Sequence, residues 1–153
     1  MRIAFFVWEY PPVLVGGLGT YAENITRKLV DFDHDVSVFT LNPGGLPVRE
    51  IIEGVEVHRP MIANATKIFP LLVTEDLRRW GTNLKFFNDV FIYNILSATK
   101  FVNELIRRDG YKFDLISVHD WLSSIAGLTI KEELKKMPLV FHVHSTEWGR
   151  SGD

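Results

Sequence analysis

The chain alternates between two patterns of hydrophobic and polar residues, one typical of buried strands and one typical of amphipathic helices. Near-continuous apolar runs such as residues 3–8 predict parallel strands, because strands of that kind are covered on both faces. Apolar residues at helical spacing between the runs predict crossover helices. Strands are expected near 2–8, 35–41, 55–59, 114–118 and 139–143, and helices over 18–29, 65–79, 82–108 and 121–135. This order predicts an α/β fold with a mostly parallel sheet, right-handed connections and helices on both faces.

Local signals refine some of these elements. The long helix over 82–108 is expected to stop at Gly110 and to bury one apolar stripe. Asp120 is expected to cap the helix that follows it, and residues 51–54 are expected to form a turn before a single strand. The stripe of the long helix comprises Leu84, Phe87, Phe91, Ala98, Val102 and Leu105.

Composition limits the class of protein. With 153 residues, 46% of them hydrophobic and 24% charged, the chain is expected to form one globular domain. A net charge of −2 gives no electrostatic case for binding nucleic acid or an anionic membrane. The absence of cysteine excludes disulfides and thiolate zinc sites. The apolar N-terminal stretch is too short to span a membrane and lacks a signal cleavage site, so we expect a cytoplasmic protein without a membrane span.

Chemistry-bearing residues follow three of the predicted strands. Ligands of open parallel α/β sheets bind beyond the carboxyl ends of the strands. The first strand delivers Trp8, Glu9 and a glycine loop at 16–19 (Gly-Gly-Leu-Gly). The fourth delivers residues 119–121 (His-Asp-Trp), and the fifth delivers residues 144–148 (His-Ser-Thr-Glu-Trp). Polar and aromatic residues therefore gather at one edge of the predicted sheet, where we expect the functional site.

The glycine loop has two interpretations. Glycines let a backbone approach a diphosphate closely, and the following helix offers free N–H groups and the positive end of its dipole. The alternative is an ordinary tight turn. The spacing does not fit a dinucleotide-binding fingerprint, in which the glycines follow the first strand directly and an acidic residue ends the second strand. Here the seven residues 9–15 separate the first strand from the first glycine, and the second strand ends in Thr40-Leu41-Asn42. The loop also lacks the Lys-Ser/Thr pair of a P-loop.

The other candidates at this edge also have structural interpretations. The two histidines, His119 and His144, can be satisfied structural residues, Trp121 can be core, and Asp120 can be no more than a helix cap. Glu9 follows a buried strand, so its carboxylate needs a partner or a ligand.

A metal site at this edge is a further alternative. His142 and His144 lie on one face of the last strand and could pair with His119 around a metal. No other histidine or carboxylate is spaced to complete a coordination shell, so we expect no metal site.

Four motifs follow one another in the chain. They are residues 9–12 (Glu-Tyr-Pro-Pro) with the loop 16–19, residues 33–40, residues 119–121 with 126–128 (Ala-Gly-Leu), and residues 141–145 (Phe-His-Val-His-Ser). In this succession they resemble the retaining GT-B glycosyltransferases, nearest to the glycogen/starch synthases and the related glycosyl group 1 transferases. The resemblance covers essentially all 153 residues.

The resemblance implies a fold, an activity and a set of partners. The fold would be two Rossmann-like domains that face each other across a cleft, and residues 1–153 would form the N-terminal, acceptor-side domain. The activity would be transfer of a glucosyl or another glycosyl group from an ADP- or UDP-sugar to a carbohydrate acceptor, with retained configuration. It would need no cofactor and no essential metal.

The resemblance also implies roles for single residues. Gly16 and Gly17 would lie against the donor diphosphate, and His144 would lie at the reacting sugar as the catalytic residue. The acceptor side would be shaped by Glu9, His119, Asp120 and Trp121.

Two positions and one absence depart from the family pattern. Leu14 stands where the synthases usually carry lysine, which favours an archaeal-type synthase or a broader family member. Asp33 stands where glycine commonly turns into the second strand, so the conformation of that turn stays open. The domain is expected to be incomplete at its C-terminus and the C-terminal nucleotide-sugar domain to be absent, so we expect the isolated chain to be inactive.

Two other classes of function remain to be separated from a transferase domain. One is a non-catalytic carbohydrate-binding module or a partner subunit of a split transferase. The other is an unrelated nucleotide-binding domain, which the spacing of the glycine loop disfavours.

Overall fold

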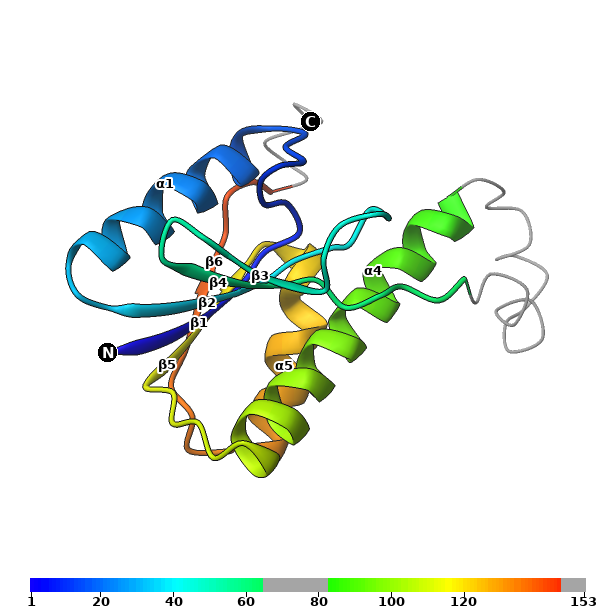
Figure 1. The fold of residues 1–153 in the computed structure, drawn as a ribbon. Coiled ribbons are helices and arrows are strands. Elements are labelled where there is room, and N and C mark those ends of the chain that lie inside the picture. Colours follow the sequence, from blue (N-terminus) through cyan, green and yellow to red (C-terminus); the bar gives the residue numbers. More distant parts are fainter. Residues whose placement is uncertain (65–82, 147–153) are drawn as a thin grey trace.

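The computed structural model describes residues 1–64 and 83–146, and within these ranges it shows a six-stranded sheet flanked by helices (Figure 1). The strand order is β3-β4-β2-β1-β5-β6. The strands are β1 (Arg2–Phe6), β2 (Asp35–Phe39), β3 (Arg49–Ile52), β4 (Val55–His58), β5 (Leu115–His119) and β6 (Leu139–His142). The helices are α1 (Gly17–Asp31), α4 (Asn83–Thr99), the π-helical continuation η1 (Lys100–Arg108), the short 3₁₀ turn η2 (Trp121–Ser123) and α5 (Ser124–Glu133). The helix predicted over 65–79 lies outside the described residues.

All neighbouring strands are parallel except β3 and β4, which pair antiparallel. The α/β prediction is therefore confirmed, and the strand expected at 55–59 is present as β4, but the prediction missed β3, part of which lies where a turn was expected. Residues 49–58 instead form a hairpin around Glu53 and Gly54, which both have positive φ (49° and 82°). A two-residue turn of that kind matches the twist of antiparallel strands.

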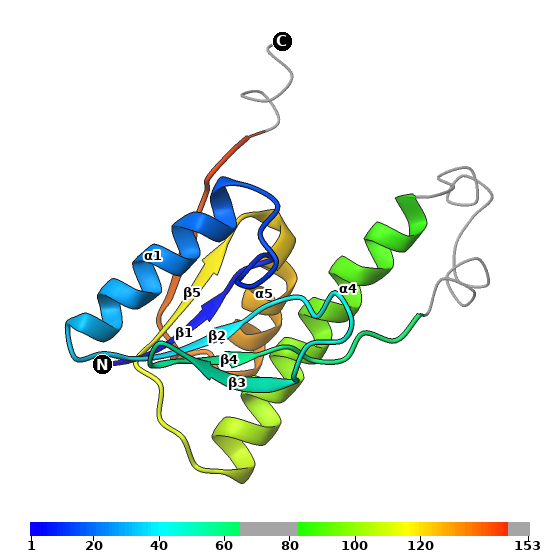
Figure 2. The same ribbon diagram turned by 45° about the horizontal axis from the view of Figure 1, so that its top comes forward.

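In the described part of the chain, α1 covers one face of the sheet, and α4 and α5 lie on the other face (Figures 1 and 2). Successive side chains of β1 alternate between the faces, as strand geometry requires. Phe5 packs into the core beneath α1 with Ala22, and Phe6 packs into the core beneath α4, η1 and α5 with Phe101. The Rossmann-like arrangement with helices on both faces is therefore confirmed.

The predicted apolar stripe of the long helix is only half right. Ala98, Val102 and Leu105 are buried, but Phe87 and Phe91 are 42% and 43% exposed. The buried positions in the first part of α4 are mostly polar, namely Asn88, Tyr93, Asn94 and Ser97 with Val90.

Two of the buried polar side chains of α4, Tyr93 and Asn94, bond backbone groups near the carboxyl edge of the sheet. The hydroxyl of Tyr93 lies 3.1 Å from the carbonyl oxygen of Val7 and 3.0 Å from that of Phe39. Asn94 donates to the carbonyl of Leu122 and accepts from the backbone N–H of Ala126. Buried backbone groups need such partners. This half of α4 therefore stabilises the edge at which the strands end.

The turn into β2 keeps a left-handed residue even though glycine is absent. After α1, Asp33 has φ 60° and its N–H bonds the carbonyl of Val30, while the N–H of His34 bonds that of Leu29. This is the Schellman arrangement, which favours glycine at the left-handed position. Gly110, the predicted stop of the long helix, also has a positive φ (72°).

Replacing Asp33 with glycine is expected to stabilise the chain by about 0.5–1 kcal/mol, because it relieves a side chain held in the left-handed region. Urea unfolding at neutral pH measures the change. Asp31→Gly is the matched control: Asp31 lies within α1, so glycine there should destabilise. If Asp33→Gly instead lowered the free energy of unfolding, the aspartate side chain would stabilise the fold by more than its left-handed backbone destabilises it.

Candidate functional site

Three loops meet at the carboxyl edge of the sheet, as the sequence predicted. Strands β1 and β5 are neighbours, and so are β5 and β6. Their ends therefore bring together the loop after β1, the residues after β5 and the residues after β6. His119 and His144 lie side by side, with His119 Nδ1 2.9 Å from His144 Nε2. This confirms the prediction that both histidines belong to the same edge.

His119 is fully buried among rings. Its imidazole stacks on Phe5 at 3.9 Å and on His142 at 4.4 Å between ring centroids. Its Nε2 lies 2.9 Å from the hydroxyl of Ser117, so both ring nitrogens have partners. Burial, followed by the neighbouring His142 and His144, lowers the pKa of His119 to about 3. His119 is therefore neutral at physiological pH.

His144 is held by contacts on three sides. Its backbone N–H donates to Oδ1 of Asp120 at 2.7 Å, and its ring lies edge-on to Tyr21 at 4.7 Å. Its Nε2 contacts His119, which leaves Nδ1 as the ring nitrogen without a partner in the described part of the chain. The side chain itself is exposed. His144 is thus fixed in orientation and open to a ligand.

Asp120 does not cap a helix, which corrects the sequence prediction. Its φ of 55° differs from the conformation of a helix N-cap, and its side chain makes no hydrogen bond to the backbone of the helical turn that follows. Its carboxylate accepts from the backbone N–H groups of His144 and Ser145, and its own N–H bonds the carbonyl of His142. A left-handed aspartate persists only where its surroundings hold it. Asp120 therefore joins the end of β5 to the segment that carries His144.

The carboxylate of Glu9 is hydrogen-bonded to the backbone at the start of the glycine loop. Its Oε2 accepts from the backbone N–H groups of Val15 and Gly16, each at 2.9 Å. A carboxylate bonded to two N–H groups holds the loop in one conformation at the start of α1. The N–H of Gly16 is consequently engaged, and the first N–H groups of α1, beginning with Gly17, are the ones that remain for a ligand.

The fold itself does not require glycine at positions 16 and 17. Neither residue has positive φ, and a Cβ on either would meet nothing within 4 Å. Gly19 differs, because a Cβ there would lie 2.6 Å from Leu14 Cδ2 and 3.1 Å from Glu9 Cβ. The tight-turn interpretation therefore has no support at Gly16 and Gly17, where the backbone faces open space.

Aromatic side chains border the site beside α4. Trp121 is 44% exposed, so the interpretation of it as core is wrong. It lies edge-on to Phe86 at 6.0 Å, and Phe86 lies edge-on to Trp8 at 5.8 Å. A cavity of about 370 Å³ opens nearby, between the loops after β2 and β4 and the start of α4.

Sequence reasoning missed three residues of this site. Ser117 could have been found, because it precedes His119 by two residues and so shares its face of β5. Tyr21 falls at helical spacing with the apolar residues of the helix expected over 18–29, so nothing marks it as part of a site. Phe86 gives no signal because the predicted buried stripe runs through its neighbour Phe87.

Neither a metal site nor a membrane span is evident in the part of the chain that the structure describes. No group of three or more His, Asp or Glu side chains among residues 1–64 and 83–146 is arranged to hold a metal ion. None of the helices in these ranges combines the length and the apolar character that crossing a membrane requires.

Comparisons with known proteins identify the family of this chain. The family model of the starch synthase catalytic domain matches residues 2–153. An uncharacterized glycosyltransferase of Methanocaldococcus jannaschii is 31% identical over 99% of this chain and 33% of its own length. The glycogen synthase of Mycobacterium tuberculosis is 28% identical over 98% of this chain and 35% of its own length. The chain therefore spans about a third of the length of the curated relatives it matches.

One solved structure supports the fold. The sucrose-phosphate synthase of Thermosynechococcus elongatus matches 94% of this chain and 33% of its own, with a TM-score of 0.53 and 15% identity. Likeness at that identity speaks for the fold alone.

Proposed function

The chain belongs to the starch synthase catalytic domain family, and from this premise we propose that it forms the N-terminal, acceptor-side domain of a retaining GT-B glycosyltransferase. The reaction is transfer of a glycosyl group, most simply glucosyl, from an ADP- or UDP-sugar to a carbohydrate acceptor. The observation that carries the proposal is the convergence of the Glu9-bound glycine loop, His119 and His144 at one sheet edge.

The donor diphosphate is assigned to the start of α1. The N–H groups of a helix's first turn and the positive end of its dipole bind anions. Gly17 opens that turn, and Gly16 lets the backbone pass close to the phosphates without a side chain in the way. Glu9 supports the same contact by fixing the loop through Gly16 and Val15.

His144 is assigned to the reacting sugar. A neutral imidazole has one donor and one acceptor nitrogen. We assign to this chain of contacts the tautomers in which Ser117 donates to His119 Nε2 and the Nδ1–H of His119 donates to His144 Nε2, so that the Nδ1 of His144 carries a proton. In these tautomers His144 is a hydrogen-bond donor toward the substrate.

The acceptor carbohydrate is assigned to the side bordered by Trp121, Asp120 and Glu9. The apolar face of a sugar ring suits an exposed aromatic side chain, and Trp121 provides one beside His119. Asp120 acts through backbone bonds to the His144 segment, so its part is to position that segment.

Catalysis by this site needs a second domain that covers the open edge of the sheet. An open edge cannot exclude water or surround developing charge. We propose that a C-terminal nucleotide-sugar domain closes the cleft, and that it corresponds, together with the rest of the N-terminal domain, to the remaining two thirds of the relatives. A partner subunit of a split transferase is the alternative, and it differs in that the second domain would come from a separate chain.

The proposal predicts no transfer by the isolated chain and restored transfer when the second domain is supplied. The test incubates ADP- or UDP-[¹⁴C]glucose with maltooligosaccharides and measures label incorporation. The chain is assayed alone, fused to the C-terminal two thirds of the M. jannaschii relative, and mixed with that part as a separate polypeptide.

The three arms separate the alternatives. Activity only in the fusion supports a single-chain enzyme, and activity on mixing supports a split transferase. Binding of maltooligosaccharide by the isolated chain, with no transfer in either combination, would replace the proposal with a carbohydrate-binding module.

A further inference from the structure

A large cavity lies at the amino edge of the sheet, away from the histidines. It has a volume of about 770 Å³ and is open to solvent. Asp114 and Pro138, which line it, immediately precede β5 and β6, and those two strands end at His119 and His142. The strands therefore separate this cavity from the proposed glycosyl-transfer site.

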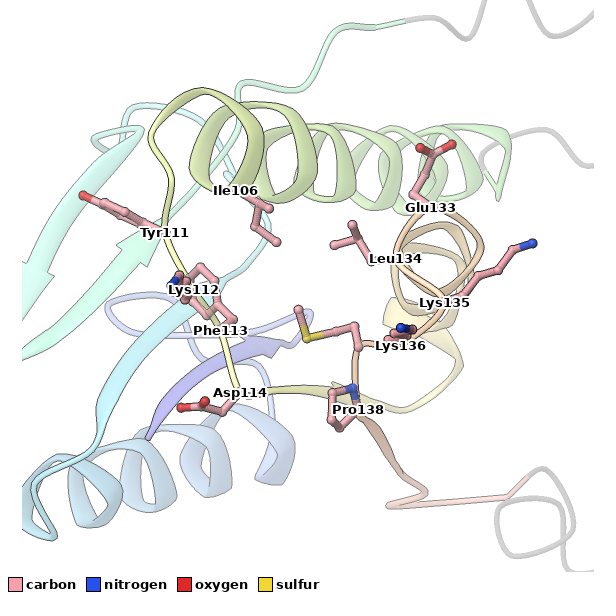
Figure 3. A pocket seen from close by; sticks show the side chains of 11 residues that line it. Ile106, Tyr111, Lys112, Phe113, Asp114, Glu133, Leu134, Lys135, Lys136 and Pro138 are labelled. Carbon is pink, nitrogen blue, oxygen red and sulfur yellow. The ribbon is translucent and has the colours of Figure 1, made fainter.

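The floor of the cavity is apolar. Figure 3 shows Ile106 from η1 and Leu134 from the end of α5 extending toward one another, with Phe113 beside them. Ile106, Leu134 and Met137 are half-buried and pack against the core formed by Phe6, Phe101 and their neighbours. A cavity of this size and lining is typical of sites for small organic molecules.

The walls are held in place by hydrogen bonds. The ammonium group of Lys131 donates to the carbonyls of Lys135 and Met137, each at 2.7 Å. On the opposite wall, the backbone N–H of Arg2 donates to Oδ2 of Asp114 and the N–H of Asp114 donates to the carbonyl of Arg2. Both loops are therefore fixed before any ligand arrives, which lowers the cost of binding.

The rim is positively charged. Lys112, Lys135 and Lys136 line the cavity, and none of the three forms an ion pair with any residue in the described ranges. The two carboxylates of the lining are already engaged, Asp114 by the N–H of Arg2 and Glu133 by Arg107. Lysines attract phosphate and carboxylate groups as point charges.

We propose that this cavity is a second ligand site, which binds a small amphipathic anion with an apolar body and one phosphate, carboxylate or sulfonate group. The body occupies the floor at Ile106, Leu134 and Phe113, and the anionic group lies between Lys112 and Lys136 on opposite walls. The inference is independent of the proposed transferase activity, because it uses none of the residues at the carboxyl edge.

The test uses 8-anilinonaphthalene-1-sulfonate as the probe, in a fluorescence titration of the folded chain. The variant Lys112→Gln/Lys136→Gln should weaken the probe's affinity by about tenfold, since it removes two attractive charges. The control Lys28→Gln/Lys85→Gln makes the same change in net charge on exposed lysines that do not line the cavity, and it should change the affinity by less than about twofold. Circular dichroism verifies that all variants are folded.

Competition distinguishes the two sources of the anionic group. Displacement by decanoate, by phenyl phosphate or by both supports the site and defines its preference, whereas 1-decanol at equal concentration should displace several-fold less because it has no charge. Equal affinity in the two lysine variants, or displacement by 1-decanol as strong as by decanoate, would overturn the proposal. A dimer in sedimentation that the probe dissociates would also overturn it, since a second copy of the chain would then be the occupant.

Discussion

Replacing His144 with alanine in the reconstituted two-domain enzyme is expected to lower kcat by about 100- to 1,000-fold with a smaller change in KM. Loss of one oriented hydrogen-bond donor from a closed site typically has an effect of that size. The structure prepares His144 for such a role, since Asp120 fixes its backbone and His119 fixes its ring. A fall in kcat with KM little changed identifies an interaction made mainly in the transition state.

The control for this experiment is His34→Ala. His34 lies in the turn between α1 and β2, close to the N-terminal amino group and at the amino edge of the sheet. Its replacement should leave kcat within about twofold, because it touches none of the three loops of the site. Equal turnover in the His144 and His34 variants would show that the reacting sugar lies elsewhere.

The edge that carries the site was predictable because parallel strands impose it. Once β1, β5 and β6 were recognised as buried parallel strands, their carboxyl ends had to meet. That reasoning brought Glu9, His119 and His144 to one edge without knowledge of any contact. The α/β class followed from the same alternation of strands and helices, and the structure confirms it.

The partners of individual polar groups were not predictable from the pattern. Asp120 precedes a helix and is of a residue type that often caps helices. Its carboxylate nevertheless bonds the backbone of His144, because β6 ends beside it. Asn94 of α4 is buried for the same kind of reason, since its side chain bonds the carbonyl of Leu122 in η2, 28 residues further along the chain. Periodicity describes which face of an element is apolar, and it carries no information on such distant backbone groups.

The hairpin of β3 and β4 was missed for a local reason. β3 is an edge strand with exposed and half-buried residues in alternation, so it lacks the apolar run that marked the central strands. The turn also has Glu53-Gly54 in place of the Asn-Gly or Asp-Gly pair that usually marks a two-residue hairpin turn in a sequence.

Acid should destabilise this chain strongly, because two histidines are buried in their neutral form. Burial, with the neighbouring His142 and His144, lowers the pKa of His119 to about 3. Burial lowers the pKa of His58 to about 4; Lys100 and Arg49 act in the same direction, and Glu56 opposes them. Unfolding restores both pKa values to about 6.5. The stabilisation from keeping these rings neutral is therefore complete above about pH 6.5 and is lost as the pH falls toward 3–4.

Each buried histidine should remove about 1.4 kcal/mol of unfolding free energy per pH unit within that window, on top of the contribution of the carboxylates. His58→Phe isolates one of the two effects. His58 stacks on Phe39 with 4.8 Å between ring centroids, and its one polar contact in the described part of the chain is Nε2 at 3.4 Å from Glu56 Oε1, which does not meet hydrogen-bond geometry. Phenylalanine can therefore keep the stack and gives up only this contact with Glu56. Urea unfolding from pH 8 to pH 4.5 should show the variant at least as stable as the natural chain at pH 8. Its advantage should then grow by about 2.5 kcal/mol by pH 4.5. Parallel pH profiles for the two proteins would show that His58 is already protonated in the folded chain or remains neutral in both states, and the buried imidazole could not then account for the loss of stability in acid.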